Sequence, residues 1–535
     1  MKSSAGGTFR LATVFLVAVG IGGSGCGSEE HIAQPAPQIQ EGTTIRLADG
    51  TVQGDIDGGS RRWRGIPYAA PPLAERRWRP PAPPIPWNGV RQAQAYGSAC
   101  PQVPSISGTP SEVEDCLYLN VWSPDPAPAA PLPVMVWFHG GSNQSGSAGD
   151  PIPFGVVEGD FYSGRTLAER RDVVVVTINY RLGVFGFFSH SSLAAEDASY
   201  PYSGNQGLLD QRAALEWVKR NILAFGGDPN KVTIFGESAG SFDTCFQVVS
   251  PGSGGLFHRA ISQSGGCTTR QRTASEAETQ AEQLIAKVEC DTANDTLACL
   301  RDVSVADLLT EAGAEFGPIV DGGFLPDQPR ALFRAGNFAK VPYILGSNSD
   351  EGTLFFLGGP TVNSEAEYLA ELEQRYGDLA DEVAAVYPVA EFDSEQDALE
   401  RVFGDFALVC PTYDTARWVA EGGADVWLYN FARPVQGPLA SLNLGATHGA
   451  EIPYVFGSYD YSSSPDDENL VNEMQGYWSR LARDGDPNGG GATVWPSYDD
   501  DADKRLNFDA PLSVLTGFRR DKCEFWWGVY DSEFD

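Results

Sequence analysis

A serine between two glycines is the feature of this sequence best suited to chemistry: residues 236–240 read GESAG, with Ser238 at the centre. The pattern G-x-S-x-G occurs once in the chain, at the end of the apolar run 232–236. A nucleophilic serine on a sharp strand-to-helix turn needs glycines two residues to either side, because Cβ atoms there would clash. Residues 240–249 can continue as a helix, whose N-terminus favours developing negative charge. Ser238 is therefore either a nucleophile or only a serine in a glycine-rich turn, depending on its partners.

Histidine is the expected base for such a serine, and the chain contains five: His31, His139, His190, His258 and His448. Hydrolases built on this turn place their triad in the chain order serine, acid, histidine. Only the last two histidines follow the serine, and His258 is too close to it to leave room for an acid on a separate strand. His448, in a glycine-flanked loop after the last strand candidate, is therefore the predicted base.

The acid should lie between the serine and the histidine, just past the end of a strand. The segment VPYILGSNSDEGTLFF (341–356) offers Asp350 and Glu351 in such a place. The pattern alone does not choose between these two carboxylates.

An acyl-transfer site also needs backbone N–H groups that stabilise an oxyanion. The glycine-rich turn HGGSNQSGS (139–147) follows a predicted strand, and Ala239 adds the N–H beside the nucleophile. A phosphate-binding loop is the rival interpretation, but the turn contains no lysine and no Gly-Lys-Ser/Thr follows.

Near-continuous apolar runs predict the strands that position these residues. They lie at 134–139, 173–180, 232–236, 259–265, 341–347 and 425–431. Such runs mark strands covered on both faces, as in a mostly parallel sheet. Segments 207–225 and 275–289 have helical spacing, so the pattern predicts an α/β fold. The long stretches 41–130 and 355–410 read as irregular decorations around that sheet.

The charge of the chain limits its partners. At 535 residues it allows one large domain or two, with 37 Lys and Arg against 71 Asp and Glu, a net charge of −34. This excess repels phosphate backbones and anionic lipid, so no nucleic-acid partner is expected. It fits an extracytoplasmic protein kept soluble by its charge better than one that recognises a basic substrate.

The N-terminus predicts export. Residues 11–22 form an apolar run long enough for the core of a signal peptide and too short to span a bilayer. The following GGSGC resembles a bacterial lipoprotein signal, in which Cys26 is lipidated, although Gly23 stands where leucine is usual; a cleaved signal with a stray cysteine is the alternative. We expect a signal peptide at 1–26, a flexible tether at 27–40, and a cell-envelope lipoprotein or a secreted protein with no other membrane contact.

The other eight cysteines favour disulfides in an oxidising compartment. No C-x-x-C occurs and the histidines are scattered, so we expect no metal site. Short spacing allows Cys100 to pair with Cys116, and Cys290 with Cys299.

Several longer motifs together resemble the type-B carboxylesterase family, which includes the cholinesterases. They are RGIPYAAPP (64–72), EDCLYLNVW (114–122), the segment 205–240, LFHRAISQSG (256–265), SDEGT (349–353) and THGAEIPYVFG (447–457). The resemblance runs from about residue 41 to 530. It implies an α/β-hydrolase fold, a mostly parallel central sheet flanked by helices with large insertions, as a single domain over 41–535.

Carried over by position, the resemblance implies a triad of Ser238, Glu351 and His448, and so selects Glu351 as the acid. It implies oxyanion donors at the N–H groups of Gly141, Ser142 and Ala239. The implied activity is hydrolysis of small to medium carboxylic esters through an acyl-enzyme, with no cofactor and no metal. A thioester, amide or lactone, or a non-catalytic surface module that binds a partner protein, is the alternative. Activity should fall below about pH 6–7 as the histidine protonates.

The resemblance also implies structural features around the site. It suggests the disulfides Cys100–Cys116, Cys290–Cys299 and Cys410–Cys523, which leaves Cys245 and Cys267 for each other. It places Glu237 and Ser264 near the active site, where they either order water and the histidine or are only satisfied buried polar groups.

The chain departs from the family pattern at three places. The oxyanion turn reads Gly140-Gly141-Ser142-Asn143 instead of Gly-Gly-Gly-Phe, which puts the acyl pocket in doubt. The loop between Cys100 and Cys116 has no tryptophan to hold a quaternary ammonium, so choline esters are not the expected substrate. The segment SGGCTTRQR lacks an aromatic found after this motif in those relatives.

Overall fold

A computed structural model describes residues 38–106, 108–149, 161–198, 200–313, 316–458 and 464–532. The compact unit begins at Gln38. The predicted signal peptide, Cys26 and most of the predicted tether lie outside the described residues. Gln40, the last tether residue, already donates its backbone N–H to Ala224 O at 3.1 Å. Among the described residues, no helix is both long and apolar enough to cross a membrane.

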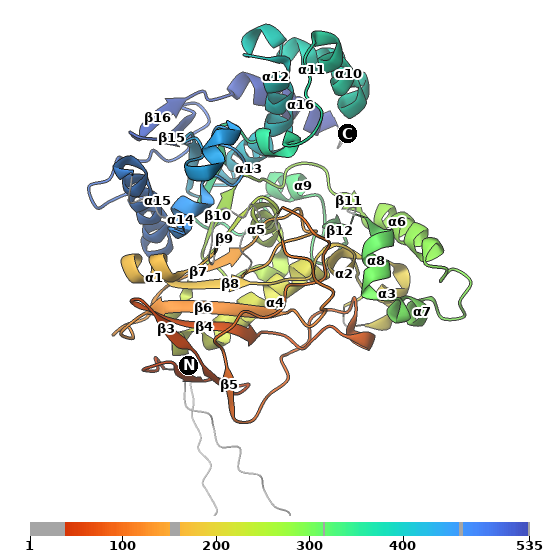
Figure 1. Cartoon of the computed structure of the whole chain (residues 1–535), viewed down its shortest axis with the longest axis vertical. Helices are drawn as coiled ribbons and strands as arrows, with labels where there is room; N and C mark the ends of the chain where they lie inside the picture. Colours follow the sequence, from red (N-terminus) through yellow and green to blue (C-terminus); the bar gives the residue numbers. More distant parts are fainter. Residues whose placement is uncertain are drawn as a thin grey trace, which may run out of the picture. The chain divides into compact units, whose positions relative to one another are not determined.

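An eleven-stranded sheet forms the centre of the described chain (Figure 1). Its order is β16-β15-β14-β13-β10-β9-β7-β8-β6-β4-β3, and the strands from β8 to β15 pair in parallel. The six predicted strands are β7 (Leu132–Phe138), β8 (Val174–Ile178), β9 (Gly227–Glu237), β10 (Arg259–Gln263), β13 (Tyr343–Asn348) and β14 (Val426–Phe431). All six are neighbours, so the prediction of a mostly parallel sheet is confirmed.

Alternation along each strand divides the core between the two faces of the sheet. In β7, Val134 and Val136 pack into one apolar cluster, whereas Met135 and Trp137 pack into another. The first cluster includes side chains of α4 (Gln206–Asn221), α5 (Ala239–Val249) and α13 (Cys410–Glu421). The second includes those of α1 (Arg165–Arg171), α14 (Ile452–Phe456) and α15 (Pro465–Asp484). Because successive side chains of each strand point to opposite faces of the sheet and both faces are covered, these strands have continuous apolar sequences.

The expectation that 41–130 is irregular is wrong. This stretch supplies β3 (Asp55–Asp57), β4 (Ser60–Pro67) and β6 (Tyr118–Pro124) to the main sheet, as well as β1 (Thr44–Arg46), β2 (Thr51–Gln53) and β5 (Val90–Gln92), which form a small separate sheet. The arginines of β4 interrupt the apolar pattern by which a buried strand is predicted. Arg61 is fully buried because its guanidinium donates to several backbone carbonyls, among them those of Gln40 and Pro124.

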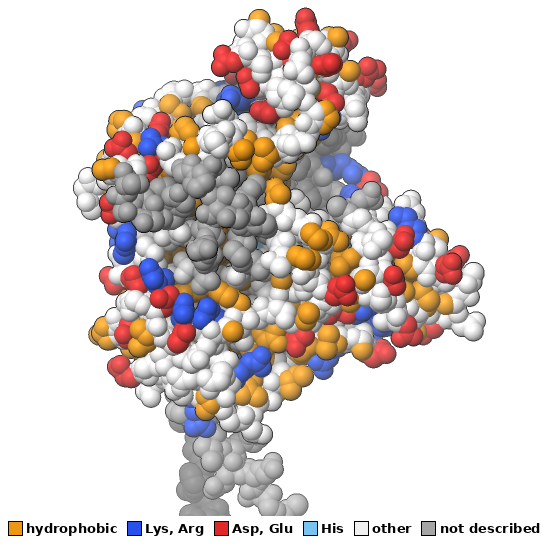
Figure 2. All heavy atoms as spheres, in the orientation of Figure 1, with side chains coloured by type: hydrophobic (Ala, Val, Ile, Leu, Met, Phe, Trp, Pro, Cys, Tyr) orange, Lys and Arg blue, Asp and Glu red, His pale blue; other side chains and the backbone are white. Residues whose placement is uncertain are grey.

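The stretch 355–410 is also regular, because it contains three helices: α10 (Glu365–Tyr376), α11 (Ala380–Val386) and α12 (Glu395–Gly404). Few residues of α10 and α11 are buried, only Tyr368 and Leu372 in the first and Val383 in the second, so the apolar periodicity that marks a helix is weak there. The helix α12 buries more of its residues, among them Leu399 and Val402. Exposed acidic side chains gather over this region in Figure 2. They include Glu365, Glu367, Glu373, Asp378, Asp381 and Glu382.

The remaining helices and strands of the described residues include the last two strands of the central sheet, β15 and β16, and the elements around it. They are α2 (Gly183–Phe187), α3 (Ser191–Glu196), α6 (Ala274–Lys287), α7 (Thr296–Asp302), α8 (Val305–Ala312), α9 (Pro329–Arg334), α16 (Arg520–Ser532), β11 (Arg272–Thr273), β12 (Ile319–Val320), β15 (Lys504–Phe508) and β16 (Ser513–Thr516). The predicted helices 207–225 and 275–289 correspond to α4 and α6. A capping box between Thr273 and Glu276 starts the latter.

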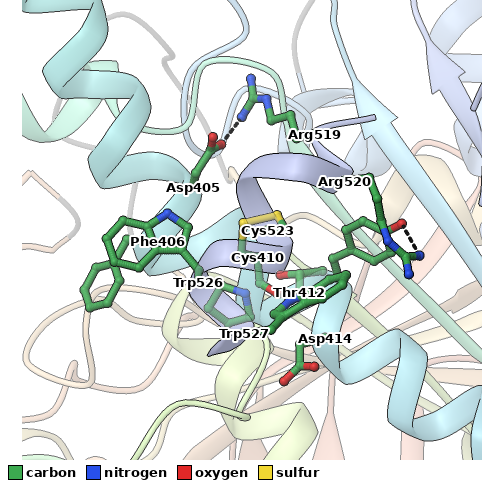
Figure 3. Close-up of a disulfide and its surroundings, with 12 residues drawn as sticks. Asp405, Phe406, Cys410, Thr412, Asp414, Arg519, Arg520, Cys523, Trp526 and Trp527 are labelled. Carbon is green, nitrogen blue, oxygen red and sulfur yellow. Dashed lines mark hydrogen bonds and ion pairs between the residues drawn. A yellow bond between two sulfur atoms is a disulfide. The ribbon is translucent and has the colours of Figure 1, made fainter. Parts of the chain in front are cut away.

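Three disulfides join the pairs that the family resemblance implies, Cys100–Cys116, Cys290–Cys299 and Cys410–Cys523, and the fourth joins the two remaining cysteines, Cys245 and Cys267. They indicate folding in an oxidising, extracytoplasmic compartment. Figure 3 shows the Cys410–Cys523 disulfide, which links α13 to α16 beside Trp526, Trp527 and the ion pair of Asp405 with Arg519. It closes the longest loop of the four and connects the C-terminal helix to the core.

Candidate active site

The carboxyl ends of neighbouring parallel strands carry the predicted site residues. Ser238 follows β9, Glu351 follows β13 and His448 lies in the loop after β14. The acid loop and the histidine loop also pair with each other through a parallel bridge between Asp350 and Thr447. Ligands and substrates of open α/β sheets meet at these strand ends, so the topology brings together residues more than 200 positions apart.

Ser238 sits on a strained turn between β9 and α5. Its φ of 55° and ψ of −124° lie outside the regions that residues other than glycine ordinarily adopt. Such a backbone conformation costs about 1–3 kcal/mol. Both flanking glycines are required sterically. A Cβ at Gly236 would lie 2.3 Å from Gly240 O, and a Cβ at Gly240 would lie 2.0 Å from Phe138 O. The turn presents a half-buried serine at the start of a helix.

His448 is held by a buried carboxylate. Its Nδ1 lies 2.7 Å from Oε2 of Glu351, and the two residues are 9% and 1% exposed. The other oxygen of Glu351 accepts the Asn348 N–H at 2.7 Å, which fixes the carboxylate. The neighbouring Asp350 instead accepts the Ala446 N–H at 2.8 Å. Of the two carboxylates that the sequence left open, only Glu351 contacts the imidazole.

The other described histidines have different partners. His139 stacks on Tyr180 with ring centroids 4.4 Å apart. Nδ1 of His258 accepts the Val232 N–H at 3.2 Å. These contacts give both rings a packing role, while His31 lies outside the described residues.

A second carboxylate, Glu237, faces the free side of the imidazole, with its Oε1 3.1 Å from His448 Nε2. Burial raises the pKa of Glu237 well above its usual range. Burial also opposes a charge on His448, but Glu237 and Glu351 outweigh that effect and raise the pKa of His448 above its ordinary value. The imidazole therefore keeps its proton to a higher pH than the expected pH 6–7.

The glycine-rich turn that follows β7, residues 140–145, is named here the oxyanion loop. Gly140 packs directly against Ser238, because a Cβ at Gly140 would lie 3.1 Å from Ser238 Cβ. Within the described part of the chain, the N–H groups of Gly141, Ser142 and Ala239 donate to no protein acceptor. Unpaired N–H groups on both sides of a serine can receive an oxyanion.

The conformation of the oxyanion loop depends on residues other than glycine. Ser142 and Asn143 both have φ of 57°, a left-handed conformation that costs most L-residues about 1–2 kcal/mol. The side chain of Asn143 is buried and donates from Nδ2 to Asp243 Oδ1 at 3.0 Å. Position 143 therefore contacts the helix α5.

Three polar residues that sequence reasoning missed lie around the predicted acid, Glu351, and the predicted base, His448. Asn348 donates from Nδ2 to Thr447 O and to Glu451 Oε2, both at 2.7 Å, and Gln263 Nε2 donates to Glu451 Oε1 at 3.0 Å. All three are buried, and burial raises the pKa of Glu451. Asn348 and Glu451 stand within three residues of the acid and the base, and that proximity was the signal available in the sequence.

Ser264 is fully buried with φ of 59°, and its backbone N–H donates to Gly346 O at 2.8 Å. Its Oγ finds no hydrogen-bond partner among the described residues. Ser264 follows Gln263, whose carbonyl accepts the Ser238 N–H at 2.9 Å. It therefore lies beside the nucleophile's strand.

One group of side chains in the described residues has the spacing of metal ligands: His190, Glu278 and Glu282. Nδ1 of His190 accepts the Ser192 N–H at 3.2 Å, so Nε2 carries the ring proton of the neutral imidazole. That N–H points at Glu282 Oε1, 3.1 Å away. A metal would need the lone pair of Nε2, so a hydrogen bond accounts for this cluster better.

The chain is similar to known esterases. Residues 41–526 match the profile of the carboxylesterase family. The para-nitrobenzyl esterase of Bacillus subtilis (strain 168) is 35% identical over 487 residues, which cover 87% of this chain and 94% of that one. The fumonisin B1 esterase of Sphingopyxis macrogoltabida is 36% identical over 483 residues, covering 87% and 86%. A solved structure of PNB esterase matches with a TM-score of 0.78 and 34% identity, covering 90% of this chain and 99% of that one.

Proposed function

Because this chain belongs to the carboxylesterase family and is a carboxylic ester hydrolase, we propose that Ser238, His448 and Glu351 form its catalytic triad. The observation that carries the proposal is the 2.7 Å contact between Glu351 Oε2 and His448 Nδ1 at the strand ends that also carry Ser238. A carboxylate on Nδ1 holds the imidazole in the tautomer whose Nε2 can accept a proton, and it stabilises the imidazolium that forms.

In the first half-reaction, Ser238 Oγ bonds to the ester carbonyl carbon while His448 Nε2 takes its proton. The carbonyl π electrons move to oxygen, and the N–H groups of Gly141, Ser142 and Ala239 stabilise that charge. The bond to the alcohol oxygen then breaks, and His448 returns the proton to the leaving alcohol.

The second half-reaction repeats this sequence with water. His448 takes a proton from water as its oxygen attacks the acyl carbon on Ser238. Collapse of the second tetrahedral intermediate breaks the bond to Oγ, which recovers its proton, and the carboxylic acid leaves. Every step uses side chains and backbone of this chain, and the three oxyanion donors act in both halves.

The proposed substrates are small to medium carboxylic esters. The similarity to a para-nitrobenzyl esterase supports aryl and benzyl esters as first probes. The same triad can cleave thioesters, amides or lactones, because it serves acyl transfer generally. Rates on p-nitrophenyl esters of increasing acyl length, measured beside matched thioesters and anilides, would define the class of bond that the protein cleaves. The absence of activity on every acyl compound would favour a non-catalytic binding module.

Substitution of the nucleophile tests the proposal most directly. Ser238→Ala should abolish turnover of p-nitrophenyl butyrate and labelling by a fluorophosphonate, while the circular dichroism spectrum stays unchanged. The neighbouring Ser241→Ala is the matched control in labelling, because Ser241 is fully buried and donates to Gly265 O. Near-wild-type turnover in Ser238→Ala would overturn the assignment.

We also propose that the protein is exported and anchored through a lipid on Cys26. The support is the apolar run 11–22 followed by GGSGC, together with disulfides that require an oxidising compartment. Expression in a bacterium with labelled palmitate should label the wild type and not Cys26→Ser. Equal labelling of both, or a wild type that stays in the cytoplasm, would refute this route.

A further inference from the structure

The side chain of Asn143 joins the oxyanion loop to the helix that begins after the nucleophile. It is 4% exposed, and its Nδ2 donates to Asp243 Oδ1 at 3.0 Å. Asp243 is fully buried in α5, whose first residue follows Ser238. A residue of the loop that supplies two proposed donors therefore bonds the element that carries the nucleophile.

The acceptor of this bond is itself fixed. Oδ2 of Asp243 accepts the side-chain amide of Gln211, in α4, at 2.6 Å. Tyr180 also contacts this carboxyl, and all three of its hydrogen-bonding neighbours are neutral. Burial raises the pKa of Asp243 to about 7. Because both oxygens are engaged, the carboxyl has one position, and the bond from Asn143 ends on a rigid anchor.

The oxyanion loop requires such an anchor because two of its residues, Ser142 and Asn143, are left-handed without being glycine. Its other described hydrogen bonds do not reach α5. The Gln144 N–H donates to Gly141 O within the loop, and the Gly183 N–H donates to Asn143 O at 2.7 Å. The amide of Asn143 is thus the hydrogen-bonded connection between the donor loop and the nucleophile's helix.

We propose that Asn143 and Asp243 are positioning residues, which hold the N–H of Ser142 at the distance from Ser238 that the transition state requires. The inference rests on the proposed function, which assigns the nucleophile and the oxyanion donors. Oxyanion stabilisation depends on donors placed within a few tenths of an ångström, so a loosened loop lowers kcat more than it weakens substrate binding.

Asn143→Ala removes the bond. We expect kcat for p-nitrophenyl butyrate to fall about 10- to 100-fold, up to the loss of one whole donor, with KM changed less than about threefold. A trifluoromethyl ketone forms a hemiketal with the serine, and its oxyanion occupies the same donors. Its inhibition constant should rise in proportion to the loss in kcat, because the adduct resembles the transition state.

Gln206→Ala is the matched control. Gln206 is also a buried amide with a single donated bond, from Nε2 to Trp78 O at 2.8 Å. Its Oε1, like Oδ1 of Asn143, has no partner among the described residues. We expect this variant to lower the unfolding midpoint as much as Asn143→Ala does, while kcat and ketone inhibition stay at the wild-type level.

Changes at the acceptor test the same bond. Asp243→Ala removes the acceptor and should resemble Asn143→Ala. Asp243→Asn leaves one oxygen for two amide donors, those of Asn143 and Gln211, so only the double variant Asp243→Asn/Gln211→Glu, which restores a donor–acceptor pair, should retain kcat within about threefold of wild type. If either variant at 243 fails to fold, the kinetics of Asn143→Ala against Gln206→Ala still decide the question.

Two results separate this inference from the proposed function. If Ser238→Ala is inactive but Asn143→Ala keeps wild-type kcat and ketone affinity, the pair only stabilises the core and this inference is wrong. If Ser238→Ala retains turnover, the proposed function itself fails, whatever Asn143→Ala does.

Discussion

Replacing Glu237 with glutamine removes the negative charge nearest to Nε2 of His448, the nitrogen proposed to accept the serine proton. Glu237 Oε1 lies 3.1 Å from His448 Nε2, and both side chains are buried. A neighbouring negative charge favours the imidazolium, so its removal should lower the pKa of His448. Since only the neutral imidazole can act as base, the acid limb of the pH–activity profile should move to lower pH.

The size of this shift can be bounded from the distance. Two unit charges 3.1 Å apart at an effective dielectric constant near 20 interact by about 5 kcal/mol, which corresponds to roughly 4 pH units. That value is an upper bound, because burial raises the pKa of Glu237 and keeps it partly protonated near neutrality. We therefore expect a downward shift of about 1–3 pH units, with the wild-type midpoint above the ordinary histidine value of about 6.5.

The assay is kcat/KM for p-nitrophenyl butyrate between pH 5 and 10 at constant ionic strength, with Glu237→Gln and Glu451→Gln compared to wild type. Glu451 is a buried carboxyl bonded to Asn348 and Gln263, and its electrostatic effect on His448 is smaller than that of Glu237. It should therefore produce the smaller shift. An acid limb that stays in place or moves upward in Glu237→Gln would refute the electrostatic reasoning.

Three further changes test the geometry of the site and the stability of the fold. Glu351→Gln should lower kcat by about 10³–10⁴-fold. The carbonyl of the glutamine must accept the Asn348 N–H, so its NH₂ group faces Nδ1 of His448 and imposes the wrong tautomer on the imidazole. A kcat near the wild-type value at neutral pH would contradict this reasoning. Gly240→Ala places a Cβ 2.0 Å from Phe138 O, so we expect little soluble, active protein from this variant. In the control Gly254→Ala the nearest atom lies 3.6 Å from the new Cβ, so the yield and the unfolding temperature should stay at the wild-type level. Expression and thermal unfolding measure both outcomes. Removing the Cys410–Cys523 disulfide, with a sequence separation of 113, should lower stability by up to about 5 kcal/mol in the loop-entropy approximation, and an unchanged denaturation midpoint would argue against that account.

The sequence predicts the strands buried on both faces better than it predicts the edges of the sheet. Strands such as β7 and β8 are apolar on both sides, so their composition alone identifies them. In β4, by contrast, arginines occupy strand positions because backbone carbonyls of distant segments receive the guanidinium of Arg61. That compensation exists only in the folded chain, and the local pattern of β4 gives no sign of it.

The site divides in a similar way. Ser238 and His448 follow from local motifs and chain order, because the elbow requires glycines and the triad has a fixed sequence of members. The choice of Glu351 over Asp350 needed the family resemblance, since adjacent carboxylates at one strand end differ only in which way the loop turns them. In the structure Asp350 accepts a backbone N–H of the histidine loop, whereas Glu351 contacts the ring, which supports Glu351 as the proposed acid.

The oxyanion loop departs from its family's sequence at positions 142 and 143. The proposed donors are backbone N–H groups, so serine at 142 keeps the N–H and only adds the unfavourable left-handed backbone, about 1–2 kcal/mol. An ordinary hydrogen bond contributes about 0.5–1.5 kcal/mol, and more when the acceptor is charged, so the bond from Asn143 to Asp243 is comparable in size to that strain. The residues at positions 142 and 143 can therefore be explained only together with Asp243, which lies 100 positions away from Asn143 and which no local motif connects to the loop. Residue types within the loop predict which atoms can act as donors, whereas the partner on α5 determines whether those donors stay in place.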